Sequence, residues 1–306
     1  MLRIFPVNFS TFTESNGIMA QMKETLNPTE AKDKYKAMWI SHSSISDFLK
    51  CPRLYYLRNM YKDPKTGHKI TVMTPHLALG QMVHEVIEGL SVVPVGKRMS
   101  LPLVSKLESS WVKVAGDKGG FKTAQQESEF KERGITMLKN LEKNPGPIMN
   151  KAIKIKSESG LPFYWFNEEE NTILCGKIDW IEYLEETDSI HVIDFKTGKY
   201  DESPSSLQLP IYLLLANNLQ RRKVEKASYW YLNRENGLNV QTLPSAEEAY
   251  EKISQIASRI KEARKTNQFK CPDSGCKHCA SLEEVVKGKG KFVGLSEYRQ
   301  DIYILK

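Results

Sequence analysis

The middle of the chain carries three short runs rich in β-branched and aromatic residues, and these constrain the fold most strongly. The runs are LPFYWFN, NTILCGKIDWIEYLE and SIHVIDFKTG, separated by the turn segments EEEN and EETD. Their spacing predicts an antiparallel meander between about residues 161 and 198. A chain with such strands at its centre must cover them with other elements in order to bury them.

A helix with a break precedes the strands. In SHSSISDFLKCPRLYYLRNMY, Ser44 followed by Asp47 predicts an N-cap, and an apolar, aromatic face continues from it. Pro52 interrupts this helix, because proline disfavours the helical conformation of the residue before it. We therefore expect Cys51 to sit at a bend, with its sulfur free to point away from the helix.

The next helix carries one polar face. TPHLALGQMVHEVIEGL begins with Thr74 as N-cap and Pro75 at the first helical position, where proline is tolerated. Gly80, His84 and Glu88 are spaced by four residues and therefore share a face. A lone histidine on a helix is most often a partly buried structural residue, so only neighbours of matching chemistry make His84 a ligand. We expect Glu88 to be solvated or to support a ligand rather than to bind metal itself.

Further elements complete the pattern. The sequence pattern predicts a helical insert between about residues 92 and 148, with its clearest helix in TAQQESEFKERGITMLKNLEKN. After Pro204 a helix in SSLQLPIYLLLANNLQ leads to a strand from Ala227, and Ser245 with Glu248 caps a long helix before the cysteines. YRQDIYIL predicts one more strand. This order of elements predicts an α/β or α+β fold around a mixed sheet.

Size and composition limit the class of protein. With 306 residues, of which 40% are hydrophobic, the chain can bury a sizeable core. The formal charge of +7 accompanies many acids, so nucleic acid is compatible as a partner but is not required. No apolar run approaches the roughly 20 residues that cross a bilayer, and the N-terminus lacks a leader pattern. We expect no membrane partner, a cytoplasmic location, a polar and disordered tail over residues 1–38, and a folded domain over residues 39–306.

The segment HVIDFKTGK places an acid two residues before a lysine. Residues i and i+2 of a strand face the same side, so Asp194 and Lys196 project together while Phe195 turns into the opposite layer. In GKIDWIEY, Asp179 lies on the preceding strand, and a hairpin can bring it beside Asp194. Two carboxylates side by side repel each other.

A divalent cation would relieve this repulsion. Mg²⁺ and Mn²⁺ prefer carboxylate and carbonyl oxygens and keep open positions for water. A metal beside a phosphate can polarise it, and Lys196 can orient or deprotonate the attacking water or offset charge in the transition state. This constellation suits phosphodiester hydrolysis. The alternative is a solvated cross-strand salt bridge between Lys196 and either Asp179 or Asp194.

Around these residues the sequence resembles the PD-(D/E)XK nuclease superfamily, specifically its RecB-like branch. GKID followed by DFKTGK matches the paired active-site strands of that branch, and GQMVHEVIE matches its upstream helix. QLPIY matches its glutamine-x3-tyrosine helix, and SISDFLKCP resembles the N-terminal segment of its cluster-bearing members. The resemblance covers roughly residues 41 to 280 in family order. It implies a restriction-endonuclease-like mixed sheet flanked by helices, within the α/β class.

The resemblance also implies the catalytic roles. Asp179 and Asp194 would act with His84 and the backbone carbonyl of Phe195 as ligands of Mg²⁺ or Mn²⁺, with Gly80 allowing close approach to His84. Lys196 would assist the attacking water.

The predicted substrate contacts lie on the same segment and on the helix after it. Gln208 and Tyr212, one helical turn apart, would line the active site or the bound strand, although by default such residues are core or surface neighbours. Lys199 would hold a phosphate, although a lysine in a turn is more often merely solvated. Other basic residues could add sequence-independent phosphate affinity; these are Lys151, Lys154, Lys156, Arg221, Arg222 and Lys223.

The cysteines point to a second metal site. Cys271, Cys276 and Cys279 follow the spacing C-x4-C-x2-C, and Cys51 lies more than two hundred positions upstream. The chain resembles the AddB subunit of helicase-nucleases and the CRISPR-associated exonuclease, which hold a [4Fe–4S] cluster with one N-terminal and three C-terminal cysteines. The order of the gaps differs from theirs, so zinc bound by four thiolates, or by three with His278, remains the alternative. Either group would tie the two ends of the domain together.

We therefore predict a metal-dependent DNA nuclease, an exonuclease in DNA repair, recombination or defence. One alternative is a nuclease subunit that is active only with a helicase or with other repair or CRISPR-adaptation subunits. The other is a DNA-binding scaffold with the same fold and no catalysis. The intact set of acids, lysine and histidine argues against the scaffold, because like charges kept together without a ligand are costly.

Overall fold

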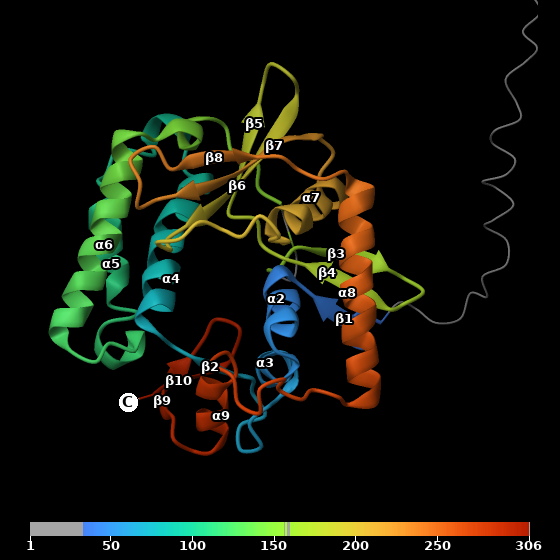
Figure 1. Cartoon of the computed structure of the whole chain (residues 1–306). Helices are drawn as coiled ribbons and strands as arrows, with labels where there is room; N and C mark the ends of the chain where they lie inside the picture. The colour runs from blue at the N-terminus through green and yellow to red at the C-terminus, as the bar shows by residue number, and fades with distance from the viewer. Residues whose placement is uncertain (1–32, 156, 158–159, 306) are drawn as a thin grey trace, which may run out of the picture. The chain divides into compact units, whose positions relative to one another are not determined.

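The computed structural model describes residues 33–155, 157 and 160–305. The chain divides into two compact units after Ala37, and the second unit, Met38–Lys306, contains the elements discussed below (Figure 1). Most of the predicted polar tail lies outside the described residues, as does Lys156, so the tail remains a prediction.

A four-stranded mixed sheet positions the candidate site. Its order is β5-β6-β7-β8, formed by Trp180–Leu184, Ser189–Lys196, Val224–Tyr231 and Leu238–Gln241. β6 and β7 run parallel, whereas β5 pairs with β6 and β8 with β7 in the antiparallel sense. Because parallel neighbours need a crossover, helix α7 (Gln208–Leu219) connects β6 to β7.

Two three-stranded sheets complete the described strands. One has the order β1-β4-β3, from Met38–Ile40, Thr172–Cys175 and Phe163–Asn167, and the other has the order β2-β10-β9, from Ile70–Val72, Asp301–Ile304 and Lys291–Leu295. β4 and β5 therefore belong to different sheets, and the predicted continuous meander is wrong. The chain leaves the sheet at Gly176, where an added Cβ would lie only 2.9 Å from Leu215 Cδ1 of α7. The last predicted strand is confirmed as β10.

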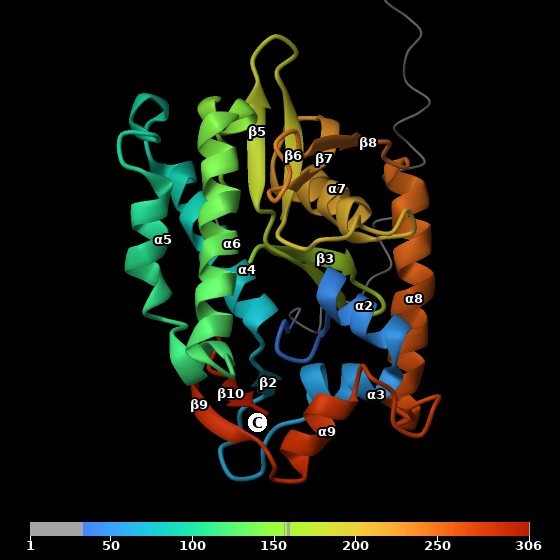
Figure 2. The same cartoon turned by 60° about the vertical axis from the view of Figure 1, so that its left-hand side comes forward.

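Helices cover both faces of the four-stranded sheet (Figures 1 and 2). On one face lie α4 (Pro75–Glu88), α5 (Leu103–Trp111) and α6 (Ala124–Lys143), so the helices predicted between residues 92 and 148 are present. On the other face α7 packs with α8 (Ala246–Thr266), which begins at the predicted Ser245 and Glu248 capping box. The α/β class with a mixed sheet and flanking helices is confirmed.

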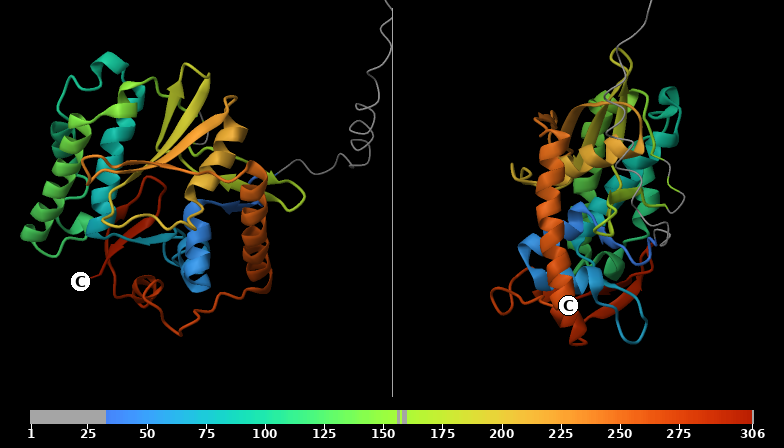
Figure 3. Two further views of the ribbon diagram at one scale, coloured as in Figure 1. Left: turned by 45° about the horizontal axis from the view of Figure 1, so that its top comes forward. Right: turned by 90° about the vertical axis from the view of Figure 1, so that its right-hand side faces the viewer.

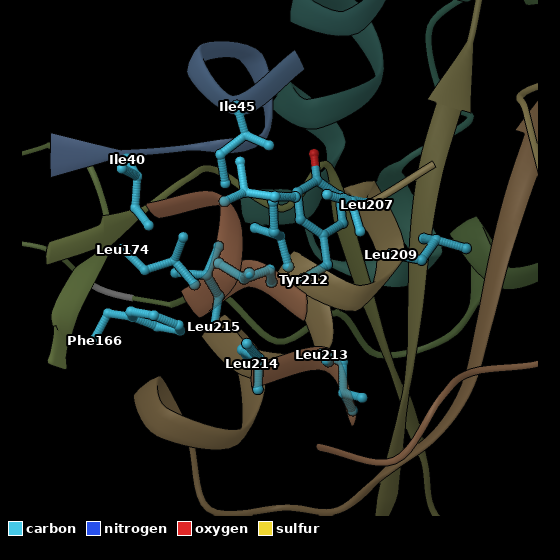
Figure 4. Close-up of a cluster of buried hydrophobic side chains, with 14 of the residues drawn as sticks. Ile40, Ile45, Phe166, Leu174, Leu207, Leu209, Tyr212, Leu213, Leu214 and Leu215 are labelled. Atoms are coloured by element: carbon cyan, nitrogen blue, oxygen red, sulfur yellow. The ribbon is translucent and has the colours of Figure 1, made fainter. Parts of the chain in front are cut away.

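The alternation of side chains along β6 separates two hydrophobic cores. Ile190 and Val192 belong to the core under α7, whereas Ile193 and Phe195 belong to the core under α4 to α6. Figure 4 shows the first core, where residues of α7 such as Leu215 meet side chains from β1, β4 and α2. Both faces of the sheet are thus buried, and seven of the eight residues of β6 are buried although only four of them are apolar.

The first helix pair differs in one detail from its prediction. α2 (His42–Lys50) is capped by Ser41, whose side chain accepts from the backbone of Ser44, and Ser44 returns the bond to complete a capping box. The predicted N-cap, Ser44, is therefore wrong: the helix begins three residues earlier, after Ser41. The predicted break is confirmed, because Cys51 is extended (φ −167°, ψ 117°) and α3 (Pro52–Tyr55) begins with proline. The last short helix, α9 (Ala280–Val286), follows the cysteines.

Candidate active site and cysteine site

The end of β6 holds a buried acid and a lysine on one face. Asp194 is 1% exposed, and its Oδ2 lies 2.9 Å from Nζ of Lys196. The same ammonium lies 3.0 Å from Oε2 of Glu202, donates to Oε1 of Gln208 and sits over the ring of Tyr229. Burial lowers the pKa of Lys196, but the two carboxylates outweigh burial and raise it above its usual value. Lys196 is therefore a firmly held cation.

Asp179 lies beside this pair, one residue before β5. Trp180 pairs with Ile193, so the same antiparallel register extended by one residue places Asp179 opposite Asp194. The backbone N–H of Phe195 donates to Oδ2 of Asp179 at 2.9 Å. The structure thus brings the two predicted carboxylates together at the end of the sheet.

Helix α4 supplies the histidine. Nδ1 of His84 lies 3.4 Å from Oδ2 of Asp179 and 3.7 Å from Oε1 of Glu88. One ligand atom each from His84, Glu88 and Asp179 can be chosen so that all three lie within 4.8 Å of one another. Glu88 also forms an ion pair with Lys177. Glu88, which we expected to be only solvated or supporting, is therefore positioned as a possible third ligand.

The charges of these groups perturb each other strongly. Burial, followed by the negative charge of Asp179, raises the pKa of Asp194 to about 7, although Lys196 opposes the shift. Burial lowers the pKa of His84, but the charge of Asp179 and hydrogen bonding to Asp179 and Glu88 outweigh it and raise the pKa to about 10. Two carboxylates thus share one buried space, and a protonated imidazole partly compensates them.

The donor atoms fit a divalent cation. Oδ2 of Asp194 is buried and lies 2.9 Å from the ammonium of Lys196, while the carboxylate of Asp179 shares the same space. Two buried carboxylates side by side are costly unless cations compensate both of them. Carboxylate oxygens with one imidazole are ligands that Mg²⁺ and Mn²⁺ accept. The residues present therefore suit a divalent metal, but the ligand atoms that lie within 4.8 Å of one another come from His84, Glu88 and Asp179, so Asp194 remains a predicted ligand.

Gln208 and Tyr212 of α7 lie next to Asp194, on the side of the sheet that α7 covers. The side-chain amide of Gln208 donates to Oδ1 of Asp194 and, at 3.4 Å, to the hydroxyl of Tyr212. Tyr212 is only 6% exposed, and burial raises its pKa well above the usual value. Their substrate contacts remain a prediction. In this structure both residues contact the catalytic candidates from the α7 side of the sheet.

Other predicted residues lie farther from the carboxylates. Lys199 is exposed just beyond the end of β6, so its phosphate contact remains a prediction. Arg222 pairs with Asp188 at 2.8 Å, beside the start of β6, so the cluster of Arg221, Arg222 and Lys223 lies at the opposite end of the sheet from Asp194. A Cβ on Gly80 would meet only Oγ1 of Thr197, at 3.5 Å, which is an ordinary contact, so close approach does not require glycine there.

Sequence reasoning missed two residues near Lys196. Glu202 holds the ammonium, and its own N–H donates to the hydroxyl of Tyr231 at 2.9 Å. His42, at the start of α2, has its pKa lowered to about 4 by burial and by the positive charge of Lys196. No periodic pattern marks Glu202, because it lies in the loop between β6 and α7.

The four predicted cysteines meet in a second site. The Sγ atoms of Cys51, Cys271, Cys276 and Cys279 all lie within 4.8 Å of one another, and none forms a disulfide. Backbone N–H groups of Gly275 and Cys276 donate to Sγ of Cys271 at 3.3 and 3.2 Å. Sγ atoms this close suit a single tetrahedral zinc ion, whose Zn–S bonds of about 2.3 Å place the thiolates about 3.8 Å apart, whereas a [4Fe–4S] cluster would require them to move farther apart.

Two other residues considered for this chemistry lie apart from the cysteine site. His278 does not belong to the group, so among the described residues the structure assembles four cysteines rather than three cysteines and a histidine. Cys175 is buried in β4, where its thiol donates to the carbonyl of Ile40, and burial raises its pKa to about 11. It behaves as a small core residue.

The fold and the site together define a class of protein. A mixed α/β domain presents two carboxylates, a lysine and a histidine at one end of its sheet, as a metal-assisted hydrolase would. A family model described as the PD-(D/E)XK nuclease superfamily matches residues 39–283. The chain belongs to this superfamily, and membership implies a metal-dependent nuclease that hydrolyses phosphodiester bonds. A comparison with curated protein sequences gives no match. Within the described part of the chain, no helix has both the length and the apolar character to cross a membrane.

Proposed function

We propose that this protein is a DNA exonuclease of the RecB-like branch that acts in DNA repair, recombination or defence. One observation carries the proposal: Asp179, Asp194, Lys196 and His84 lie together at the end of one sheet, where two carboxylates share a buried space. Such an arrangement is costly without a ligand and is suited to metal-assisted hydrolysis.

Each residue has a distinct role in this proposal. Asp179, Asp194 and His84 hold Mg²⁺ or Mn²⁺, with the carbonyl of Phe195 as a further ligand. The bound ion supplies a Lewis acid for the phosphate and lowers the pKa of water. The N–H of Phe195 fixes the orientation of Asp179 through their 2.9 Å hydrogen bond.

Lys196 acts as a cation rather than as a base. Its raised pKa keeps the ammonium form, and three groups hold it in place: Asp194, Glu202 and Gln208. A fixed ammonium stabilises charge that develops on the phosphate in the transition state and orients the attacking water. Gln208 links this lysine to Asp194, so it supports the geometry of both.

The test uses the purified full chain with Mn²⁺ and labelled DNA. End-labelled linear strands and circular single strands of the same sequence are incubated with the wild type and with the Asp194→Ala variant. We expect the wild type to release short products from linear strands and to leave the circles intact, whereas the variant cuts neither. Cleavage of the circles would establish an endonuclease instead, and full activity of the variant would exclude Asp194 from the mechanism.

The same assay separates the two alternatives. A subunit that works only within a helicase-nuclease or CRISPR-adaptation assembly would bind Mn²⁺ but would cut no DNA alone. A silent DNA-binding scaffold would bind DNA without any divalent ion at the carboxylates. Calorimetric titration of Mn²⁺ into the wild type and the Asp194→Ala variant distinguishes these cases.

For the cysteine site we propose a structural [4Fe–4S] cluster, with zinc as the alternative. The support is the meeting of Cys51, at the bend between α2 and α3, with three cysteines that precede α9. The group would join these distant segments without any need for electron transfer. Anaerobic purification followed by absorbance and elemental analysis decides between iron with sulfide and one zinc ion per chain, and a Cys51→Ser variant should lose either.

A further inference from the structure

A cleft of about 870 Å³ adjoins the candidate active site, and the C-terminal hairpin forms part of its wall. His84, Glu88 and Asp179 line the cleft, as do residues of the loop between β9 and β10. Figures 1 and 3 show this loop beside α4. Tyr298, in the loop, lines the cleft and is 67% exposed.

The hairpin that carries this tyrosine is anchored. The N–H of Ser296 donates to the carbonyl of Gln300, and the N–H of Gln300 donates to the hydroxyl of Ser296, at 2.9 and 3.0 Å. At its base, the buried Asp301 lies 2.9 Å from Nδ1 of His68 and accepts from the hydroxyl of Thr66. An aromatic ring is thus presented to the cleft on a fixed support, although folding of the chain does not bury it.

The cleft is lined by as many acids as lysines, but among the described residues two of its lysines are left without an acidic partner and can bind phosphate. Four lysines line it: Lys113, Lys118, Lys154 and Lys177. Two of them pair with acids of α4, Lys113 with Glu85 at 2.7 Å and Lys177 with Glu88. Within the described part of the chain, no acid lies within ion-pair distance of Lys118 or Lys154. Glu297 is a further acid of the lining, and the remaining one, Asp179, belongs to the candidate metal site.

We propose that Tyr298 stacks on an unpaired nucleobase of the strand whose phosphate is bound at the carboxylates. Lysine ammonium groups that bind phosphates, combined with an exposed aromatic ring, form the usual means of holding a single strand. A base within a duplex has both faces covered by its neighbours, so the ring selects a strand end or a single-stranded segment. The proposal rests on the proposed nuclease function, because it assigns the cleft to the same substrate.

The test measures binding separately from cleavage. Fluorescence anisotropy of a labelled oligothymidylate is recorded with the Asp194→Asn chain, so that no strand is cut. In that background Tyr298→Ala should weaken binding about fivefold or more, whereas Tyr298→Phe, which keeps the ring, should stay within about twofold. Phe292→Ala is the matched control: it removes another exposed aromatic ring (52% exposed) of the same hairpin that does not line the cleft, and should leave the dissociation constant unchanged.

Two further substrates make the test specific for stacking. An oligonucleotide of abasic sites should bind equally to the Asp194→Asn parent and to the same chain with Tyr298→Ala. A blunt duplex should also bind both equally. The proposal would be overturned if both chains bound the normal oligonucleotide equally. It would also be overturned if Tyr298→Ala weakened binding of the duplex as much as binding of the oligonucleotide. If the wild type cuts DNA but Tyr298→Ala does not change oligonucleotide binding, the stacking is rejected and the nuclease function is not. A stacking effect in a chain whose wild type never cuts DNA supports the stacking and rejects a nuclease that acts alone.

Discussion

The four-stranded sheet carries two buried acidic clusters, one on each face of β6, and they differ in how far their polar atoms are satisfied. On the α4 to α6 side, each carboxylate oxygen of Glu182 has a donor. Oε1 accepts from the side-chain amide of Asn150, and Oε2 lies 2.8 Å from Nδ1 of His191. The other ring nitrogen of His191 lies 2.7 Å from the hydroxyl of Ser228. This cluster is complete within the chain.

The cluster on the other face is incomplete. Asp194 shares its buried space with a second carboxylate, Asp179, and the ammonium of Lys196 opposes but does not cancel their repulsion. The pKa shifts of the two acids have opposite signs. Burial raises the pKa of Glu182, but hydrogen bonds from His191 and Asn150 outweigh it and lower the pKa below 4.5, whereas burial and Asp179 raise that of Asp194. The fold therefore stabilises the charge of Glu182 and destabilises that of Asp194.

This difference separates a structural network from a binding site. A satisfied buried network contributes to stability and has nothing left to bind a ligand. An unsatisfied one is retained where a ligand completes it. We expect substitutions in the first cluster to change stability and substitutions in the second to change activity.

The largest effect should come from Asp194→Asn. Cleavage of DNA with Mn²⁺ should fall by more than about 1000-fold, beyond the loss from removing one preorganised hydrogen-bond donor. In EDTA the free energy of unfolding should not fall, because the change removes a buried charge whose pKa is raised next to Asp179. Denaturant unfolding and a single-turnover assay measure the two quantities. A large loss of stability with normal cleavage would reverse the comparison.

Glu202→Gln should have the next largest effect. The change weakens the hold on Lys196 without removing a candidate ligand, so we expect kcat to fall roughly 10- to 100-fold while DNA binding changes little. The neighbouring Asp201→Asn variant is the control, because Asp201 pairs with Arg234 at the surface, and it should stay within about twofold. Equal rates for both variants would mean that Glu202 does not position the lysine.

The sequence predicted the candidate catalytic residues of the incomplete cluster, but it did not predict the residues that hold them in place. Strand alternation and a hairpin indicate that Asp179, Asp194 and Lys196 lie together, whereas the resemblance to the nuclease branch supplies His84. The structure brings all four together. Glu202 has no such mark, because a contact across the loop to Tyr231 places it. Local patterns report which face a residue occupies, but they do not report which loop closes over it.

The errors in predicting the fold also arise from contacts that local sequence patterns do not report. The run from residue 171 to 185 has uniform strand character, yet it divides between two sheets, because β4 pairs with β1 and β3 whereas β5 pairs with β6. Ser41 and Ser44 both suit an N-cap, and the backbone of Ser41, which is extended, decides between them. The short strands β1, β2, β8 and β9 were not predicted. β1 and β2 pair with β4 and β10, which are distant in sequence, whereas β8 and β9 pair with neighbouring strands but are only four and five residues long.

Glu182→Gln should change stability and leave cleavage unchanged. At pH 7 we expect a loss of about 1–3 kcal/mol in the free energy of unfolding, because a buried charged acceptor of His191 is removed. Since the pKa of Glu182 is lower in the folded chain, its contribution is complete above the ordinary value of 4.5 and is lost as the pH falls through the folded value. Urea unfolding at several pH values should show the gap between variant and wild type narrowing in acid. A gap that stays constant would remove the charge of Glu182 from the explanation.

Ser228→Ala should have the smallest effect and sharpens the comparison most. It removes one hydrogen bond to His191 and leaves the charge of Glu182 in place, so we expect a loss of about 0.5–1.5 kcal/mol. Because no ionised group is removed, this loss should depend on pH much less than that of Glu182→Gln. Urea unfolding and cleavage rates, measured on the same preparations, test both points. If Ser228→Ala instead slowed cleavage tenfold in a chain that remained folded, the two faces of β6 would be coupled and the assignment of one face to stability would fail.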